Sequence, residues 1–372
     1  MRIGVPKEIK VHEYRVGMTP ASAAEAVHRG HAVLVETGAG NGIGATDEAY
    51  VRAGAEIQPD AAAVFARADL IVKVKEPQAE ERRMLREGQV LFTYLHLAPD
   101  PEQTRELLDT GATAIAYETV TDAGGGLPLL RPMSQIAGRM AVQAGAHCLE
   151  KEAGGRGILL SGVPGVAPAK VVVIGGGTVG ANAAVVALGM GADVTVLDTD
   201  VATLRHLEHR MGLGLKTVYS NRHTLEEQVT AADLVIGAVL VPGAEAPKLV
   251  TRSMVMVMKS GAAIVDVAID QGGCCETSRP TTHAAPTFVV DEVVHYCVAN
   301  MPGAVAHTSA YALNNATLPF ILALAGKGAK QALADDPHLL AGLNVHKGKL
   351  TYRAVADAQG LPFENPHTAL GA

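Results

Sequence analysis

Short apolar runs alternate with segments of mixed polarity through residues 1–120. The apolar runs are rich in Val, Ile and Leu, which is typical of buried strands, and they predict strands at residues 2–5, 31–36, 70–74, 90–96 and 112–116. Thr19-Pro20 predicts a helix start, with an N-cap followed by proline at the first helical position. Helices are expected at residues 21–29, 49–54 and 101–110. This alternation predicts an open parallel sheet with helices on both faces.

The same rhythm returns after residue 170. Glycines at 124–126 interrupt the first pattern as a candidate hinge, and residues 133–151 predict one long helix. Residues 304–323 predict a further helix that Pro319 would kink. Beyond the long helix, strands are expected at residues 171–174, 194–197, 234–237, 255–258, 263–266 and 287–290.

Residues 171–198 combine the parts of a dinucleotide-binding unit. A β-branched strand leads into Gly175, Gly177 and Gly180, which form G-x-G-x-x-G, and an Ala- and Val-rich helix follows. The first glycine allows the tight turn, the second lets backbone approach a pyrophosphate, and the third lets helix pack on strand. A second strand ends at Asp198, whose carboxylate would accept hydrogen bonds from a ribose hydroxyl and repel a 2′-phosphate. The sequence therefore predicts NAD as cofactor, bound to a Rossmann-like unit.

Composition bounds the class of protein. A chain of 372 residues is long enough for about two domains, and 48% hydrophobic with 19% charged residues describes a globular protein. The net charge of −7 and the absence of Trp argue against a basic or base-stacking surface for nucleic acid. No apolar run is long enough to span a membrane, and the charged N-terminus lacks a signal-peptide core, so we expect a cytoplasmic protein without a membrane partner.

The cysteines fit neither a disulfide framework nor a zinc site. Cys148 and Cys297 stand alone and Cys274-Cys275 are adjacent, so no CxxC pair exists. Buried thiols are the expectation, and no metal is predicted.

Four titratable residues follow predicted strands at the edge where ligands bind in open α/β sheets. Arg15 lies in the loop after the first strand, Lys75 ends the third, His96 ends the fourth, and Asp270 lies beyond the strand at 263–266. Each also has a structural interpretation: Arg15 and Lys75 would be ordinary surface charges, His96 would make a structural hydrogen bond, and Asp270 would form the glycine turn that it precedes. Lys73 shares a strand face with Lys75 and competes with it for a role.

Together these residue types suit oxidation or reduction of a small carboxylic acid. Arg15 binds a carboxylate in bidentate fashion, and Lys75 adds a point charge. His96 exchanges a proton with an amine, hydroxyl or carbonyl oxygen, because an unperturbed imidazole titrates near pH ~6.5. Asp270 is suited to orient a water or to help the proton exchange. Hydride would pass between the substrate carbon and the nicotinamide.

Eight ordered motifs resemble the alanine dehydrogenase family, which also includes the NAD-binding part of proton-translocating transhydrogenase. They lie at residues 2–8, 15–20, 73–77, 91–98, 132–140, 175–180, 265–273 and 298–305. The resemblance implies an α/β fold of two Rossmann-like, doubly wound parallel-sheet domains with a cleft between them. It also implies a discontinuous substrate domain, residues 1–127 plus 306–372, an NAD domain, residues 128–305, and a homohexamer.

The family's activity implies NAD-dependent, reversible oxidative deamination of L-alanine to pyruvate and ammonium. By the same resemblance, Arg15 and Lys75 hold the substrate carboxylate, while His96 and Asp270 give or take protons. The implied cofactor contacts are Ser134, Gly175, Gly177, Thr178, Val179, Gly180, Asp198, Ser220, Val239, Leu240, Val267, Ala268, Ile269, Asp270, Val298, Ala299, Asn300 and Met301. The chain departs from the family at Thr203, where a basic residue is frequent.

Three other functions compete with this interpretation. A transhydrogenase subunit would need no small-carboxylate pocket, and Arg15, Lys75 and His96 weigh against it. An NAD-binding sensor would tolerate the loss of His96 or Asp270, and both are present. A dehydrogenase of glycine or serine stays open, because a methyl pocket contributes only ~1–3 kcal/mol of selectivity.

Overall fold

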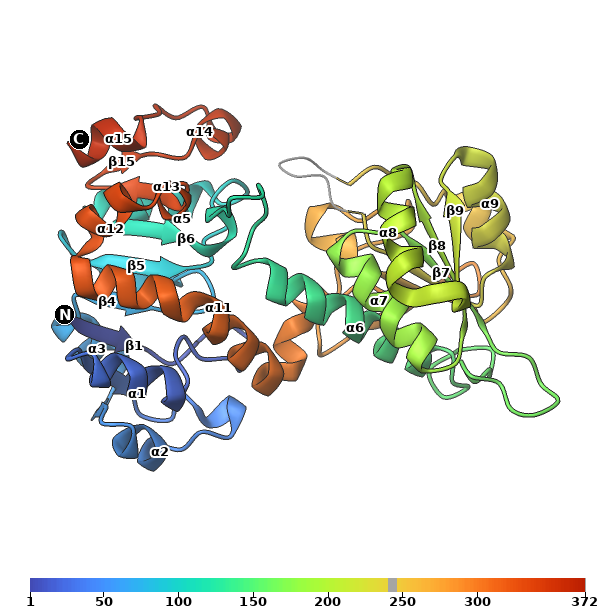
Figure 1. Ribbon diagram of the computed structural model, residues 1–372, viewed down its shortest axis with the longest axis horizontal. Helices are drawn as coiled ribbons and strands as arrows, with labels where there is room; N and C mark the ends of the chain where they lie inside the picture. The colour runs from blue at the N-terminus through green and yellow to red at the C-terminus, as the bar shows by residue number, and fades with distance from the viewer. Residues whose placement is uncertain (240–245, 372) are drawn as a thin grey trace. The chain divides into compact units, whose positions relative to one another are not determined.

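The computed structural model describes residues 1–239 and 246–371, which form two compact α/β units (Figure 1). The first unit combines Met1–Met133 with Gly303–Ala372, and the second is Ser134–Pro302. Helix α6 (Arg131–Cys148) begins in the first unit and continues in the second. The first unit is therefore built from both ends of the chain.

The described residues of the first unit form an eight-stranded sheet in the order β15-β14-β6-β5-β4-β1-β2-β3. Neighbours from β6 to β3 are parallel, whereas β14 is antiparallel to both β6 and β15. The strands are β1 (Arg2–Val5), β2 (Ala32–Glu36), β3 (Glu56–Gln58), β4 (Leu70–Val72), β5 (Val90–Thr93), β6 (Thr113–Ala116), β14 (Leu343–His346) and β15 (Lys349–Leu350).

The helices of the first unit begin at local capping signals. At α1 the predicted start is confirmed, since the Thr19 side chain accepts the Ser22 N–H and Pro20 occupies the first helical position. Helix α11 packs on β4 and continues through Pro319 (Figure 1). The helices are α1 (Pro20–His28), α2 (Asp47–Arg52), α3 (Ala61–Arg67), α4 (Ala79–Arg82), α5 (Pro101–Asp109), α11 (Ala306–Lys327), α12 (Ala329–Asp335), α13 (Pro337–Leu340), α14 (Arg353–Gln359) and α15 (Pro366–Leu370), with short 3-10 turns at Asn41–Ile43 and Tyr117–Thr119.

The described residues of the second unit form a seven-stranded sheet in the order β12-β13-β11-β10-β7-β8-β9. All neighbours are parallel except the edge pair β12 and β13. Its strands are β7 (Lys170–Ile174), β8 (Asp193–Asp198), β9 (Leu215–Tyr219), β10 (Leu234–Gly237), β11 (Ala263–Asp266), β12 (Thr287–Val290) and β13 (Val293–Tyr296). Its helices are α7 (Thr178–Gly189), α8 (Val201–Met211), α9 (Arg222–Ala231) and α10 (Arg252–Met256), with 3-10 turns η3 (Gly212–Gly214), η4 (Val267–Gln271) and, at the passage to the first unit, η5 (Met301–Val305).

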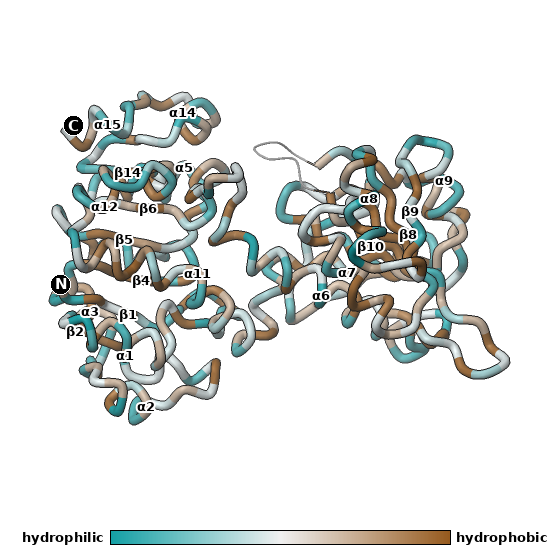
Figure 2. The backbone as a smooth tube through the Cα atoms, viewed as in Figure 1, coloured by the Kyte–Doolittle hydropathy of each residue, from teal (hydrophilic) through white to brown (hydrophobic). Residues whose placement is uncertain are grey.

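Both cores are built on strands that are buried on both faces. Every residue of β4, β5, β6, β10 and β11 is buried, which explains their continuous apolar sequences. Figure 2 shows β4 and β5 in brown, the colour of hydrophobic residues. The predicted α/β class with two Rossmann-like units is confirmed, and the antiparallel edge strands are an addition to it. Within residues 1–239 and 246–371, no helix is long and apolar enough to cross a membrane.

One predicted strand, at residues 255–258, is wrong. The segment lies in and just after helix α10, because the Thr251 side chain accepts the Met254 N–H and caps a helix there. Met256 and Val257 are each 64% exposed, so the apolar run is not a buried strand. Strands β4 and β5 also end earlier than expected, so that Lys75 and His96 follow the strands.

Candidate active site

The glycine motif of the second unit forms a tight turn between β7 and α7. Gly175 has φ of 99°, a conformation that side-chain-bearing residues rarely adopt. A Cβ on Gly180 would lie 1.8 Å from the Gly175 carbonyl oxygen, so only glycine allows this approach of helix to strand. These two glycines therefore have the structural roles that the sequence predicts for them.

Gly177 differs from both, because it leaves space open. It is the N-cap of α7, and a Cβ placed on it would meet no heavy atom within 4 Å. Gly177 and Thr178 are exposed, and Val179 is half-buried. The first N–H groups of a helix and its dipole attract phosphate, so this loop fits the pyrophosphate of a dinucleotide.

Asp198 ends β8 and is hydrogen-bonded to the glycine loop. Its carboxylate accepts the Gly176 N–H at 2.7 Å and the Asp200 N–H at 2.8 Å. Its carbonyl oxygen accepts the Ser220 N–H at 2.9 Å. Thr203, where the family often has a basic residue, donates its hydroxyl to Asp200. Asp198 thus holds the glycine loop in place. It also lies at the position where an acidic residue that binds the ribose hydroxyls is expected.

Apart from Ser134 and Leu240, the other predicted cofactor residues also follow strands of this sheet. Val239 follows β10 beside the Gly175 backbone, and η4 with residues 267–270 follows β11. Residues 298–301 follow β13, where Asn300 has φ of 64° and its carbonyl oxygen contacts the His283 ring. Ser134 is half-buried in α6, and Leu240 lies outside the described residues.

This set surrounds the point where the strand order reverses. Strands β8 and β9 lie on one side of β7, and β10, β11 and β13 lie on the other. Ligands of open α/β sheets bind at such a reversal, beyond the carboxyl ends of the strands. The residues after β7, β8, β9, β10, β11 and β13 therefore share one edge, which is where a dinucleotide is expected.

Asp270 and the adjacent cysteines follow β11 on the same edge. Asp270 is exposed at the end of η4. The buried Asp266 carboxylate accepts the N–H groups of Cys274, at 2.9 Å, and Cys275, at 3.2 Å. Burial raises the pKa of the Cys274 thiol well above its ordinary value, and the nearby charge of Asp266 raises it further. The cysteine pair is therefore a buried packing element that closes the turn carrying Asp270.

Arg15 of the first unit forms a buried ion pair with Glu13. The Glu13 carboxylate accepts Arg15 Nη2 at 2.6 Å and Nε at 2.7 Å, and it also accepts the Arg15 backbone N–H at 3.0 Å. Arg15 Nη1 lies 3.0 Å from the Met133 sulfur. Burial alone would lower the pKa of Arg15. The hydrogen bonds to Glu13 and the negative charge of Glu13 outweigh this effect, so the pKa of Arg15 is raised. The guanidinium is therefore fixed in orientation and permanently charged.

The structure separates the two lysines after β4. Lys73 is fully buried and pairs with Glu81 at 2.6 Å and Glu8 at 3.1 Å. Glu8 also accepts the Val74 N–H at 2.7 Å. Lys75 is half-buried, and its carbonyl oxygen accepts the Thr93 hydroxyl. Lys73 is thus held inside the fold by two carboxylates, whereas Lys75, just after the end of β4, is partly open to solvent.

His96 occupies a strained backbone position after β5. Its φ is 48°, in the left-handed region, and its side chain is 46% exposed. The Glu118 carboxylate accepts the His96 N–H at 2.6 Å and the Leu95 N–H at 3.2 Å. The imidazole stacks on the buried Tyr94 ring, with centroids 5.8 Å apart and planes 6° apart.

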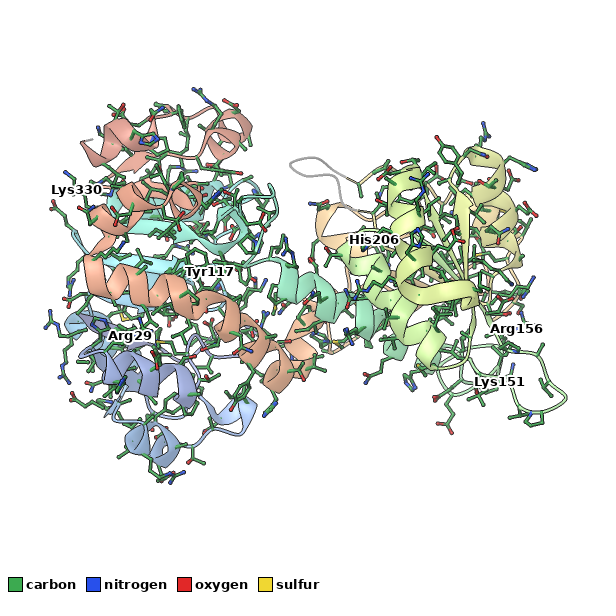
Figure 3. The ribbon with its side chains drawn as sticks, viewed as in Figure 1. Arg29, Tyr117, Lys151, Arg156, His206 and Lys330 are labelled. Atoms are coloured by element: carbon green, nitrogen blue, oxygen red, sulfur yellow. The ribbon has the colours of Figure 1, made fainter. Side chains whose placement is uncertain are left out.

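Tyr94 in turn rests on Tyr117, labelled in Figure 3, with ring centroids 5.1 Å apart and edge to face. The Tyr94 hydroxyl donates to the Leu129 carbonyl oxygen at 2.7 Å. Burial raises the pKa of Tyr94, so its hydroxyl stays protonated and the ring is a neutral platform for His96.

Arg15, Lys75 and His96 therefore follow β1, β4 and β5, three neighbouring parallel strands at the reversal of this sheet's order. Asp270 belongs to the second unit. Sequence reasoning missed Glu8, Glu13 and Glu118. Glu8 and Glu13 lie in the loop after the first strand, and that position is the one signal that points to them.

The family models "Alanine dehydrogenase/PNT, N-terminal domain" and "Alanine dehydrogenase/PNT, C-terminal domain" match residues 4–137 and 141–353. The chain is 64% identical to the alanine dehydrogenase of Halomonas elongata over 371 residues, which cover 100% of both chains. It superposes on a solved structure of L-alanine dehydrogenase with a TM-score of 0.94 and 52% identity, covering 96% of this chain and 99% of that one. A solved transhydrogenase from Sinorhizobium meliloti matches with a TM-score of 0.82 and 26% identity, over 95% of this chain and 100% of that one. From fold, motifs and full-length similarity together, the chain belongs to the alanine dehydrogenase/PNT family.

Proposed function

We propose that this chain catalyses the NAD-dependent oxidative deamination of L-alanine. L-alanine, NAD⁺ and water give pyruvate, ammonium, NADH and a proton, and the reaction is reversible. The observation that carries the proposal is the placement of Arg15, Lys75 and His96 after three neighbouring parallel strands. The relatives that match over their full length are named alanine dehydrogenase.

Arg15 and Lys75 are proposed to bind the substrate carboxylate. The Glu13 ion pair fixes the orientation of the Arg15 guanidinium, so little side-chain freedom is lost when a ligand binds. Lys75 adds a second positive charge from the adjacent strand. Together they fix the position of the substrate's α-carbon. Because the reacting carbon is already in place, less entropy is lost on the way to the transition state.

His96 is proposed to move the proton at the reacting centre. Its exposed imidazole is held by stacking on Tyr94 and by the Glu118 contacts to its backbone. In the deaminating direction it takes a proton from the water that adds to the imine carbon. In the aminating direction it donates a proton to the hydroxyl that leaves as water. Asp270 is proposed to assist this exchange.

The second unit is proposed to hold NAD. The Gly177 turn and the N-terminus of α7 suit the pyrophosphate, and Asp198 suits the ribose hydroxyls and disfavours a 2′-phosphate. Ser134, Thr178, Val179, Ser220, Val239, Leu240, residues 267–270 and residues 298–301 are proposed to complete the site. Bound NAD⁺ supplies the hydride acceptor.

The test is NADH formation with a panel of L- and D-amino acids at pH ~9–10, where part of the amine is neutral. The panel includes glycine and L-serine, and each is run with NAD⁺ and NADP⁺. We expect L-alanine with NAD⁺ to react fastest, and His96→Ala to lose turnover while it still binds NADH. If NADH binds and no amino acid is oxidised, the proposal fails, and a transhydrogenase-like or sensor role replaces it.

The homohexamer that the family resemblance implies is also a proposal. Leu159, Val163 and Val166 are 61%, 55% and 61% exposed on one loop of the second unit, and contact between copies would bury such apolar side chains. Light scattering on the purified chain measures the assembly mass and tests it directly. The cytoplasmic location expected from the N-terminal sequence stays a prediction.

A further inference from the structure

Arg15 lies within a layer of ion pairs, of which all but Lys10–Glu76 are buried. The ion pairs around Arg15 and Lys75 include Arg15–Glu13, Lys73–Glu8, Lys73–Glu81 and Lys10–Glu76. With Lys75 they contain four cations, namely Lys10, Arg15, Lys73 and Lys75, and four carboxylates, namely Glu8, Glu13, Glu76 and Glu81.

Glu13 is the carboxylate of this layer in direct contact with Arg15. Its side chain is 0% exposed and that of Arg15 is 1% exposed, so water screens their interaction little. A bidentate pair at 2.6 and 2.7 Å cancels most of the guanidinium charge at a distance, while the N–H groups keep their geometry. Arg15 therefore orients a ligand through its N–H groups, but together with Glu13 it adds little net positive charge to the site.

Lys75 is then the principal source of positive charge for a bound anion. Its charge also acts on Glu76. Burial alone would raise the pKa of the Glu76 carboxyl, but the charges of Lys75 and Lys10 hold it below its ordinary value. Glu118, against His96, adds a further carboxylate at the same strand edge. The layer therefore carries no net positive charge, so one substrate carboxylate is held by its contacts with Lys75 and Arg15, and a second carboxylate without such contacts would be repelled.

We propose that Glu13 is a specificity-determining residue that restricts this site to substrates with one carboxylate. It acts through Arg15: by offsetting the guanidinium charge it makes dianionic 2-oxo acids and acidic amino acids poor ligands. The proposal rests on the proposed function, because it takes Arg15 and Lys75 as the carboxylate-binding groups.

Oxamate and oxalate are a matched probe pair for this proposal. Both resemble pyruvate and are nearly isosteric with each other, but oxamate is a monoanion and oxalate a dianion above pH 7. Their inhibition constants, measured against pyruvate during NADH oxidation with ammonium, therefore differ by the effect of one charge and of an amide donor in place of an oxygen acceptor. The change in their ratio between wild type and Glu13→Gln isolates the effect of charge. A role of Glu13 in folding alone would change both constants together.

In the wild-type protein we expect oxamate to bind more tightly than oxalate. Glu13→Gln keeps the shape and an acceptor for Arg15 but removes the negative charge, so the preference for oxamate should fall roughly tenfold. Glu25→Gln is the control, because Glu25 forms an exposed pair with Arg29 and lies on α1 away from this layer. Glu13→Asp keeps the charge and should keep the wild-type preference.

A wild-type protein that binds oxalate as tightly as oxamate overturns the proposal, and this measurement needs no variant. A change of less than threefold in folded Glu13→Gln, or an equal change in Glu25→Gln, also overturns it. Oxidation of L-alanine is followed in the same preparations. If the wild-type protein oxidises no amino acid, the proposed function fails; if it does and the preference is insensitive to Glu13, only the role of Glu13 fails.

Discussion

The Glu118 carboxylate accepts the backbone N–H of His96 at 2.6 Å, and the same carboxylate accepts the N–H of Leu95. His96 adopts φ of 48°, in the left-handed region that most residues with a side chain avoid. The contact offsets this strain and aims the imidazole over Tyr94. Glu118 is therefore a positioning residue for His96.

Replacing Glu118 with Ala should misplace His96 and lower kcat about 100-fold, because small displacements of a proton-transfer group have large effects on rate. Substrate KM should change less, since Arg15 and Lys75 are untouched. Glu118→Gln keeps one acceptor and should retain more activity than Glu118→Ala. Steady-state kinetics with L-alanine measure both values, and equal kcat in Glu118→Ala and wild type would contradict this role.

Replacing Lys73 with Met should destabilise the first unit by about 3–5 kcal/mol, because it leaves Glu8 and Glu81 buried without their cation. Urea unfolding measures the change. Lys73→Met combined with Glu81→Gln should recover part of the loss, since one uncompensated charge is then removed. Lys10→Met, at a partly exposed pair with Glu76, is the comparison and should cost far less.

Asp198→Asn and Asp198→Ala separate the two roles of Asp198. Both remove the negative charge that disfavours NADP⁺, but only Asn keeps a side-chain acceptor for the Gly176 N–H. We expect kcat/KM with NADP⁺ to be higher in Asp198→Asn than in Asp198→Ala, by roughly tenfold if one hydrogen bond is worth about 1–1.5 kcal/mol. Equal or reversed values would show that the link to Gly176 does not order the loop.

His295 gives the second unit a defined dependence of stability on pH. Burial lowers the pKa of His295, and its ring contacts the Thr277 hydroxyl at 2.7 Å and the Val293 carbonyl at 2.9 Å. Below its ordinary pKa of about 6.5 the unfolded chain takes up a proton that the folded state resists. Stability is therefore full above that pH and falls as the pH drops.

Urea midpoints between pH 8 and pH 5 measure this dependence. His295→Gln keeps a donor and an acceptor but cannot be protonated, so its midpoint should fall less over the same range. An identical fall in both proteins would exclude His295 as the cause.

Sequence reasoning placed Arg15, Lys75 and His96 at strand ends because apolar runs locate buried strands, and polar residues just after them share an edge. It did not find Glu13 or Glu118 as partners, because ion pairs and strained backbone depend on side-chain packing that spacing does not encode. Strand 255–258 was predicted from β-branched and apolar residues, and the cap at Thr251 overrode that preference.

Both strands of the hairpin at the end of the chain, β14 (Leu343–His346) and β15 (Lys349–Leu350), were missed for a different reason. β15 (Lys349–Leu350) is too short to show a period, and β14 acquires its partner from β6, far away in the sequence. The half-exposed β9 (Leu215–Tyr219) carries polar residues that weaken its apolar signal. Domain boundaries came from the family resemblance, whereas the pattern along the chain predicted the connection as a candidate hinge at residues 124–126 and a long helix at 133–151, which the structure has as α6 (Arg131–Cys148).

The discontinuous first unit has a consequence for synthesis on the ribosome. Strand β6 (Thr113–Ala116) pairs with β14 (Leu343–His346), so the sheet edge of the first unit stays open until more than two hundred further residues have been translated. The second unit, Ser134–Pro302, is continuous and emerges whole before that edge is covered. Domains fold as units when their residues are available. The nascent chain is therefore expected to complete its second unit before its first, with the edge of β6 exposed to other strands in the interval.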